Sequence, residues 1–517
     1  MSKTMYRFRS KLEGGVFITV FSVVFLISGL GTIHAAEQRR GGTLNFGVEN
    51  EFAGFEVIKS ASRLAINGAI AANTIMEPLF RMDDQGELIP VLGLSATPSE
   101  DGKIWTIKLR RGVQFHDGTP FNADAAVEHW RRLFDPQNKF RGRSALSVIE
   151  SVEKAEEDTV QFHLTHAWLP FRQVLTSTRG LINLVPSPKA VAQGTQDRAP
   201  VGTGPFMFGE WIAGDRFVVV KNTNYWRKNS PYLDAIVFRP MPDSQTRFAS
   251  LTSGQLDMIW SDRGNIIQKA MPDPLLVVYQ NDDNGAEIFI INTANPPMDD
   301  IKVRQALAHA HNQARHVKMA YQDSIPIVHH PFGMDFQCPD DGYREYDPDK
   351  ARRLLSGYDA GLKLECLHSN SPRGREIGEI TQQLFKDVGV QANPVGLNFG
   401  PVVKKVISGQ YQMSTWRMSS RPDQGPALVR AFHSKSPGNL SHYTNPEMDK
   451  LLMAQQMETD PSQRQKLLCQ IARLINADVP ILYRGGMRSH IIARSAVKGI
   501  THISHGIVRL EAVWLKD

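Results

Sequence analysis

Serine, histidine, aspartate and lysine occur throughout this chain, but not in the spacings that bring a nucleophile and a base together. The sequence contains no GxSxG, no HExxH, no GxxxxGK[ST] and no GxGxxG. These motifs mark nucleophile elbows, zinc peptidase helices, phosphate loops and dinucleotide-binding folds. We therefore expect no catalytic residues and no enzymatic activity. A secreted hydrolase is the alternative function.

Two groups of histidines have the residue type that binds metal ions. His309, His311 and His316 lie within eight residues, and His329 and His330 are adjacent. On a helix only residues three or four apart share a face, so His309 and His311 point to different faces. We interpret all five as ordinary exposed histidines, with a metal site as the alternative, and we expect no metal and no cofactor.

The chain has three cysteines, Cys338, Cys366 and Cys469. Their spacing is too wide for a CxxC metal or redox site. At most one disulfide can form, and the sequence does not say which pair forms it.

One glycine-rich stretch, VGTGPF at residues 201–206, lacks the spacing of a phosphate loop. Pro205 also removes a backbone amide that an anion site would use. We therefore expect a tight crossing of two backbone segments there.

The composition is that of an ordinary globular protein. Its 517 residues are 41% hydrophobic and 22% charged, which excludes disorder, collagen and coiled coil. At about 100 to 200 residues per domain, this length predicts roughly three domains. The formal net charge is +6, and without residues 1–36 there are 55 basic and 52 acidic residues, a net +3. This balance predicts no nucleic-acid partner.

The first 36 residues have the order of an export signal. Four basic side chains precede residues 14–33, which carry no charge, and the small residues Ala35 and Ala36 follow. We predict cleavage at or just after Ala35 or Ala36 and a soluble periplasmic protein. The alternative is an uncleaved membrane anchor, because twenty uncharged residues are long enough to span a bilayer. No cysteine lies near the cleavage site, so we expect no lipoprotein.

Short apolar runs separated by turn signals predict strands in the first half. The runs are TLNFGV, NTIMEPLF, KIWTIKL, TVQFHL, GPFMFGEW, RFVVVK and AIVFRP. One helix interrupts them, with Asn122 as its cap and Trp130 and Leu133 on its apolar face.

Strands and helices alternate from about residue 300. Asp299 or Asp300 can cap one helix, and Asp347 with Pro348 begins another. Further helices are predicted at REIGEITQQLFKDVGV, PVVKKVISG, EMDKLLMAQQM and RQKLLCQIARLI, and strands at LKLECLHS, around Val395 and at YQMSTWRM. This alternation predicts an α/β fold with strands covered by helices.

Six stretches occur in an order that resembles one known family. They are EPLF, DGKIWTIKLRRGVQFHDGTPFNADAAVEHW, VGTGPFMFGEWIAGDRFVVVKNTNYW, INTANPPMDDIKVRQALAHA, DPDKARRLL and SHYTNPEMDKLL. Together they are similar to bacterial extracellular solute-binding proteins of family 5, the periplasmic peptide/nickel class of ABC-transporter substrate-binding proteins. The resemblance implies a periplasmic-binding-protein-like α/β fold of class II (cluster C), with two main lobes, a hinge and a small inserted α+β domain.

The same resemblance implies domain boundaries. Residues 1–36 are the signal peptide, and domain I is discontinuous, comprising 37–57, 185–286 and 490–517. Domain II is inserted as residues 58–184, and domain III is the α/β lobe of residues 287–489. Two strands would cross between domains I and III, near residues 287–292 and 484–490.

The implied function is that of a periplasmic solute receptor of an ABC importer. A small peptide-like solute would be enclosed between domains I and III and delivered to the permease subunits in the inner membrane. The receptor is expected to be a monomer. Within the family, a free di- or oligopeptide and a nickel chelate are alternative ligands.

The resemblance selects STWRMSSRPDQGPALVRAFHS as one segment of the solute site. Trp416 would form a flat apolar wall, and Arg417, Arg421 and Asp423 would supply charges. Peptide-binding relatives place a carboxylate for the ligand ammonium where residues 419–421 of this chain are Ser-Ser-Arg. Core packing is the alternative role of Trp416.

The second segment is HSNSPRGREIGEI, where Arg373 and Arg375 lie at the start of a helix. In peptide-binding relatives an arginine at this helix start receives the ligand carboxylate, and Arg375 is the matching position. Relatives also line the pocket from domain I, where this chain has Phe52 and Phe55. A solvent-exposed arginine pair and two core phenylalanines are the alternatives. From the sign of these charges we expect a solute with at least one carboxylate.

Overall fold

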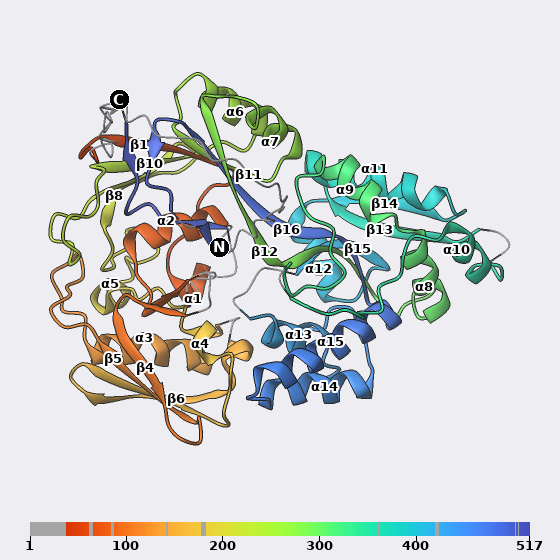
Figure 1. The fold of residues 1–517 in the computed structure, drawn as a ribbon, viewed down its shortest axis with the longest axis horizontal. Helices are drawn as coiled ribbons and strands as arrows, with labels where there is room; N and C mark the ends of the chain where they lie inside the picture. Colours follow the sequence, from red (N-terminus) through yellow and green to blue (C-terminus); the bar gives the residue numbers. More distant parts are fainter. Residues whose placement is uncertain are drawn as a thin grey trace, which may run out of the picture. The chain divides into compact units, whose positions relative to one another are not determined.

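The computed structural model describes residues 38–60, 66–83, 87–140, 143–176, 182–334, 336–358, 361–418, 423–501, 503–504 and 506–516 (Figure 1). The chain divides into two compact units, Met1–Gln38 and Arg39–Asp517. All helices and strands given below belong to the second unit. The predicted export leader lies outside the described residues, as does Arg421 of the predicted site.

A ten-stranded sheet organises the second unit. In spatial order its strands are β14 (Gln391–Leu397), β13 (Lys363–Ser369), β15 (Met413–Met418), β12 (Leu276–Ile291), β16 (Ile481–Arg494), β11 (Met258–Ser261), β1 (Thr43–Val48), β10 (Ala235–Pro240), β9 (Arg216–Lys221) and β8 (Phe206–Ile212). The strands β12 and β16 have 16 and 14 residues and pair antiparallel along most of their length. They therefore connect the two halves of the sheet, as Figure 1 shows.

The half that contains β1 is mixed in direction. β1 pairs in parallel with β10 and β11, whereas β9 and β8 continue the sheet antiparallel. Phe217 and Val219 of β9 and Ile236 and Phe238 of β10 are fully buried. They alternate with less buried neighbours because successive side chains of a strand point to opposite faces. The strands predicted at TLNFGV, RFVVVK and AIVFRP are confirmed.

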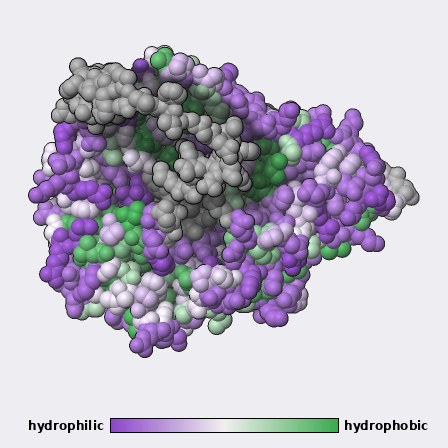
Figure 2. Space-filling view, viewed as in Figure 1, coloured by the Kyte–Doolittle hydropathy of each residue, from purple (hydrophilic) through white to green (hydrophobic). Residues whose placement is uncertain are grey.

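The other half is the predicted α/β part. β13 pairs in parallel with both β14 and β15, and β15 is antiparallel to β12. Helices cover both faces: α8 (Ile301–Ala310), α10 (Pro348–Leu354) and α11 (Pro372–Lys386) share one core, and α12 (Phe399–Ile407), α13 (Gly425–Phe432), α14 (Pro446–Met457) and α15 (Pro461–Asp478) share another. The predicted caps Asp300 and Asp347 are confirmed. The visible face of this part is mostly hydrophilic (Figure 2).

A four-stranded antiparallel sheet forms a separate layer, in the order β4 (Gly93–Pro98), β5 (Ile104–Leu109), β7 (Thr159–Leu164) and β6 (Ile149–Glu156). Helix α3 (Ala123–Phe134) packs on β6 and β7. The side chain of Asn122 accepts a hydrogen bond from the amide of Ala125 at 3.1 Å, which confirms the predicted cap. We call residues 93–174, from β4 to α4 (Phe171–Val174), the small-sheet lobe.

The remaining elements are α1 (Val57–Ser60), α2 (Ile66–Ile75), α5 (Pro188–Ala192), α6 (Ser244–Thr252), α7 (Gly264–Ala270), α9 (Gln313–Tyr321), the 3₁₀ turns η1 (Pro136–Asn138) and η2 (Arg143–Leu146), β2 (Phe80–Met82), β3 (Leu88–Pro90), β17 (Val497–Lys498), β18 (Ile503–Ser504), β19 (Ile507–Val508) and β20 (Trp514–Leu515). The strand predicted at NTIMEPLF is wrong in its first part, because Ile75 ends α2. This helix is buried on nearly all sides, so its apolar run has no period that separates helix from strand. Among the helices that the described ranges contain, none has the length and apolarity to cross a membrane.

The VGTGPF stretch is a tight backbone crossing, as predicted. The Gly204 amide donates to the carbonyl of Ile75 at 2.8 Å. A Cβ on Gly202 would lie 2.3 Å from the carbonyl oxygen of Ile75, and one on Gly204 would lie 2.6 Å from that of Thr74. No side chain fits at either position without moving α2.

Cys338 and Cys469 form a disulfide, and Cys366 is buried without a cysteine partner. The disulfide ties the long connection between α9 and α10 to α15. The prediction of at most one disulfide is therefore confirmed, and the structure identifies the pair.

The predicted exposure of the first histidine group is wrong. His309, His311 and His316 are only 5%, 3% and 0% exposed. The rings of His311 and His316 lie in the core between α8, α9 and the sheet, where His311 Nε2 and His316 Nδ1 are 3.2 Å apart beside Phe289 and Phe385, whereas His309 Nδ1 lies 2.9 Å from the carbonyl oxygen of Glu345. In the part of the chain that the structure describes, no three metal-binding side chains are grouped for a metal ion.

Candidate functional site

The order in which the chain adds strands to the sheet reverses at β13. From β13 it passes through α11 to β14, and from β14 it returns through α12 to β15 on the other side of β13. The helices α11 and α12 cover opposite faces, because Ile377 and Phe385 belong to one core cluster and Val402 and Val406 to the other. Ligands of such sheets bind in the crevice outside the carboxyl ends of the strands at this switch point. The segments that follow β13 and β15 border this crevice.

Three helices begin at this edge of the sheet. Ser371 caps α11, and its side chain accepts from the Gly374 amide at 3.0 Å. The helices α12 and α13 begin after Asn398 and Gln424. Helix N-termini carry free N–H groups and partial positive charge, so this edge attracts anions.

Glu287 of β12 lies between two arginines at the same place. Its Oε1 accepts from Arg417 Nε at 2.6 Å, and its Oε2 accepts from Arg484 Nη2 at 2.8 Å. Arg484 also donates to Tyr321 Oη at 2.9 Å and to the carbonyl of Ile288 at 3.1 Å. The Arg484 side chain is 3% exposed, whereas that of Arg417 is 47% exposed. Of these two arginines, Arg417 is therefore the one that solvent and a ligand can reach.

The two arginines at the start of α11 have different surroundings. The Arg373 guanidinium lies 4.1 Å from the Tyr321 ring centre and donates through Nη1 to the carbonyl of Ala320. Its Nη2 is buried and has no hydrogen-bond partner among the described residues. Arg375 is exposed and donates to the carbonyl of Asn370 in its own loop. Arg373, two residues before the position that the family resemblance selects, has the unused donor.

Acidic residues face this edge from the other half of the sheet. Glu49 follows β1 and Asp262 follows β11, at the carboxyl ends of two parallel strands. Arg263 lies 3.3 Å from Glu49 and 3.4 Å from Asp262.

Arginines from both halves of the sheet lower the pKa of Asp262. Burial alone would raise the pKa of its carboxyl, but the charges of Arg263, Arg373 and Arg417 outweigh burial and lower the pKa. Burial alone would likewise raise the pKa of the Glu287 carboxyl, but the charges of Arg417 and Arg484 outweigh burial and lower that pKa. Both carboxylates are therefore ionised near neutral pH.

The described residues of this group carry an excess of positive charge. They are the arginines Arg247, Arg263, Arg373, Arg417 and Arg484 and the acids Glu49, Asp262, Glu287 and Glu376, the last of which lies 3.5 Å from Nη1 of Arg373. We call them the crossing cluster. Five guanidinium groups against four carboxylates favour an additional anion.

The other described residues of the predicted site have partners in the core or in ion pairs. Phe52 and Phe55 are 5% and 1% exposed and pack against Phe217, which corresponds to the core alternative. Both oxygens of Asp423 accept from Arg464, at 2.7 and 2.8 Å, so this carboxylate already has a partner. Trp416 is half-buried and packs at the border of the core that α12 to α15 share.

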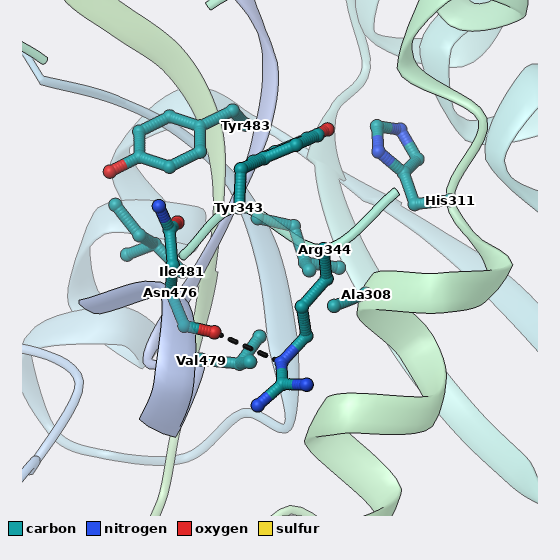
Figure 3. A pocket seen from close by; sticks show the side chains of 9 residues that line it. Ala308, His311, Tyr343, Arg344, Asn476, Val479, Ile481 and Tyr483 are labelled. Carbon is teal, nitrogen blue, oxygen red and sulfur yellow. Dashed lines mark hydrogen bonds between the residues drawn. The ribbon is translucent and has the colours of Figure 1, made fainter. Parts of the chain in front are cut away.

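Two cavities lie away from the switch point. One of about 20 Å³ lies between α8 and β16 and is lined by residues that include Ala308, Tyr343 and Tyr483 (Figure 3). It is large enough for about one water molecule. The other, of about 390 Å³, lies beside the small sheet, where Leu94 and Trp105 line it. Neither contains a residue of the crossing cluster.

Residues 87–439 match the family model of bacterial extracellular solute-binding proteins, family 5. The chain belongs to this family. The family assignment covers both the small-sheet lobe and most of the α/β part, which agrees with the resemblance found in the sequence.

Curated relatives and solved structures agree with family 5. The glutathione-binding protein GsiB of Pectobacterium atrosepticum is 28% identical over 433 residues, covering 80% of this chain and 83% of that protein. The heme-binding protein A of Haemophilus influenzae is 27% identical, covering 76% and 78%. The structure of DppA from Helicobacter pylori with the peptide STSA has a TM-score of 0.81 at 24% identity, covering 93% and 99%. This structural likeness confirms the periplasmic-binding-protein-like fold.

Sequence reasoning missed several members of the crossing cluster and the neighbouring Tyr321. Glu287 and Arg484 were expected only at the strand crossings, and Asp262 and Tyr321 were not selected. A signal is present, because Glu287 and Arg484 are lone charges in the apolar runs EIFII and VPILYRGG. Two such charges on adjacent strands predict a buried ion pair. Nothing in the sequence places Asp262 beside them.

Proposed function

We propose that this family 5 solute-binding protein is a periplasmic receptor for a small carboxylate-bearing solute, which it delivers to the permease of an ABC importer. The single observation that supports the carboxylate is the charge of the crossing cluster. Five arginines and four acids meet beside the switch point, and Nη2 of Arg373 is buried with no hydrogen-bond partner among the described residues. A ligand carboxylate beside Arg373 and Arg417 would supply the missing anion.

The geometry favours a carboxylate over an ammonium group. An arginine that is enclosed without an anion is a desolvated unpaired charge, which costs several kcal/mol. In the loop after β15, the acid that could bind a ligand ammonium group is Asp423. Both oxygens of Asp423 already accept hydrogen bonds from Arg464. Amine recognition therefore has less support than carboxylate recognition.

The proposed mechanism is closure of two lobes around the solute. β12 and β16 connect the halves of the sheet, and a solute that touches both halves stabilises the enclosed form through its higher affinity for that form. Domains I, II and III with the boundaries given in the sequence analysis would be the moving parts. The enclosed form would then be the one that the permease recognises.

Further parts of the proposal concern the chain as a whole. We propose export through the leader of residues 1–36, action as a monomer without catalysis, and release of the solute unchanged. Intact-mass measurement of the periplasmic protein tests the first point, and mass spectrometry of the recovered solute tests the last.

A thermal-shift screen tests the carboxylate. The probes are glutathione, small peptides with a free C-terminal carboxylate, the same peptides as C-terminal amides, opine-like acids and nickel chelates. A ligand at 100 times its Kd should stabilise the folded protein by about 2.7 kcal/mol. We expect the acids to raise the Tm and the matched amides to raise it much less. Equal shifts for acid and amide would contradict the proposal.

A further inference from the structure

A buried hydrogen bond joins the small-sheet lobe to the α/β part. Trp168 follows β7 of the small-sheet lobe, and its Nε1 donates to Gln456 Oε1 of α14 at 2.7 Å. The two residues are 288 positions apart in the chain, and they are only 2% and 6% exposed. A second contact joins the same two parts, where η2 packs against α13.

A hydrogen-bond network connects α14, which carries the acceptor Gln456, to the loop after β15. Gln455, the neighbour of Gln456 on α14, accepts from Arg464 Nη2 at 3.0 Å and donates to the carbonyl of Gly425 at 3.4 Å. Arg464 holds Asp423 through two hydrogen bonds, and Asp423 in turn accepts from the Gly425 amide at 2.7 Å. Residues 423–425 are the start of α13 and the end of the loop that borders the switch point.

The start of α13 is in close contact with this network. A Cβ on Gly425 would lie 2.3 Å from Arg464 Nη2 and 2.5 Å from Gln455 Oε1. Arg464 and Gln455 are 6% and 0% exposed. A displacement of α14 therefore displaces the segment that follows β15.

We propose that Trp168 is a positioning residue that fixes α14, and through it the loop after β15, in the solute-enclosing arrangement. This inference rests on the proposed function, because it assumes that a solute enters between parts that separate. When the parts separate, water solvates the indole N–H and the Gln456 amide. When they meet, both groups are buried and must satisfy each other. The hydrogen bond thereby sets how readily the enclosed arrangement forms.

The test replaces Trp168 by phenylalanine and uses Trp130→Phe as the matched control. Trp130 is also buried in the small-sheet lobe, at 1% exposure, but its Nε1 has no hydrogen-bond partner among the described residues. Both substitutions remove an indole N–H from a core, and the first alone leaves a buried acceptor unpaired on α14.

Two measurements on the protein without added solute give the result. We expect Trp168→Phe to increase hydrogen exchange of the amides of residues 425–432 about tenfold, because loss of a buried partner favours the separated arrangement by that order. Its radius of gyration in small-angle scattering should also increase. Trp130→Phe should change neither quantity. Equal behaviour of the two variants, or exchange in residues 425–432 that stays at the wild-type rate, would overturn the inference.

A second variant tests the same contact in case the Trp168→Phe protein misfolds. Gln456→Met keeps the length of the side chain and removes the acceptor from the other side of the contact. It should reproduce the faster exchange of residues 425–432. If it does not, Trp168 contributes packing alone. Because these measurements contain no solute, a failed search for a carboxylate ligand leaves their outcome unaffected.

Discussion

At the scale of single residues, Arg373 differs from its neighbour Arg375 in what each guanidinium contacts. Arg373 is packed on Tyr321 and has a buried donor without a hydrogen-bond partner among the described residues, whereas Arg375 is exposed and bonded within its own loop. We predict that Arg373→Ala weakens binding of a carboxylate ligand by about 2 to 5 kcal/mol, since it removes a buried charge-assisted pair. Arg375→Ala should change affinity much less. Isothermal titration with the acid that gives the largest thermal shift measures both.

The reverse order of these two effects would contradict the assignment. A large loss in Arg375→Ala with unchanged affinity in Arg373→Ala would restore the position that the family resemblance selects. Thermal unfolding of each variant without ligand shows whether the fold is intact.

The buried pair His311 and His316 makes stability depend on pH. Burial lowers the pKa of His311 to about 3 and holds that of His316 well below its usual value of 6.5. Both are therefore neutral in the folded chain and take up protons on unfolding below pH 6.5. Stability is complete above pH 6.5 and falls as pH decreases toward the folded pKa values, by about 1.4 kcal/mol per pH unit for each histidine.

Chemical denaturation between pH 7 and pH 5 checks this sign. The double variant His311→Gln, His316→Gln should lose stability at pH 7 and show a shallower dependence on pH. A slope equal to that of the wild type would mean that other groups carry the proton uptake.

At the scale of elements, α7 packs on the end of α9 across the two halves of the sheet. A Cβ on Gly264, the first residue of α7, would lie 2.0 Å from the carbonyl oxygen of Tyr321. We predict that Gly264→Ala destabilises the protein by about 1 to 3 kcal/mol, because α7 and α9 must move apart. The matched control is Gly400→Ala in α12, where no described residue outside the helix backbone and the two chain neighbours lies within 4 Å of the added carbon.

The control substitution should change the free energy of unfolding in the opposite direction. Gly400→Ala is expected to stabilise the protein by about 0.5 kcal/mol through reduced freedom of the unfolded chain. Urea denaturation of both variants compares them directly. Equal effects of the two substitutions would show that the close approach of α7 to α9 is not retained in solution.

At the scale of the whole molecule, the Cys338–Cys469 disulfide closes a loop between residues 131 positions apart. It limits the freedom of the unfolded chain over most of the α/β part. We predict that Cys338→Ser with Cys469→Ser lowers the free energy of unfolding by about 2 to 5 kcal/mol. Denaturation under oxidising conditions measures the loss, and reduction of the wild type should reproduce it. Cys366 is buried in both proteins and takes no part.

The sequence by itself determined the elements whose signals are local. The Asn122, Asp300 and Asp347 caps, most strands and the α/β alternation depend on residues within a few positions of each other. Six ordered motifs were also enough to predict the family. The segments around Trp416 and Arg373 were predicted to border the solute site because they lie at or after the ends of predicted strands, and the structure has both beside the switch point, where a solute site stays a prediction.

The tertiary structure alone decided which side chains in those segments are available. Asp423 forms an ion pair with Arg464, and Phe52 packs in the core. Glu287, Arg484 and Asp262 come together from strands that are far apart in the chain. The same holds for the burial of His311 and His316 and for the contact of Trp168 with Gln456. Burial and ion pairing depend on long-range packing, which no local period or spacing encodes.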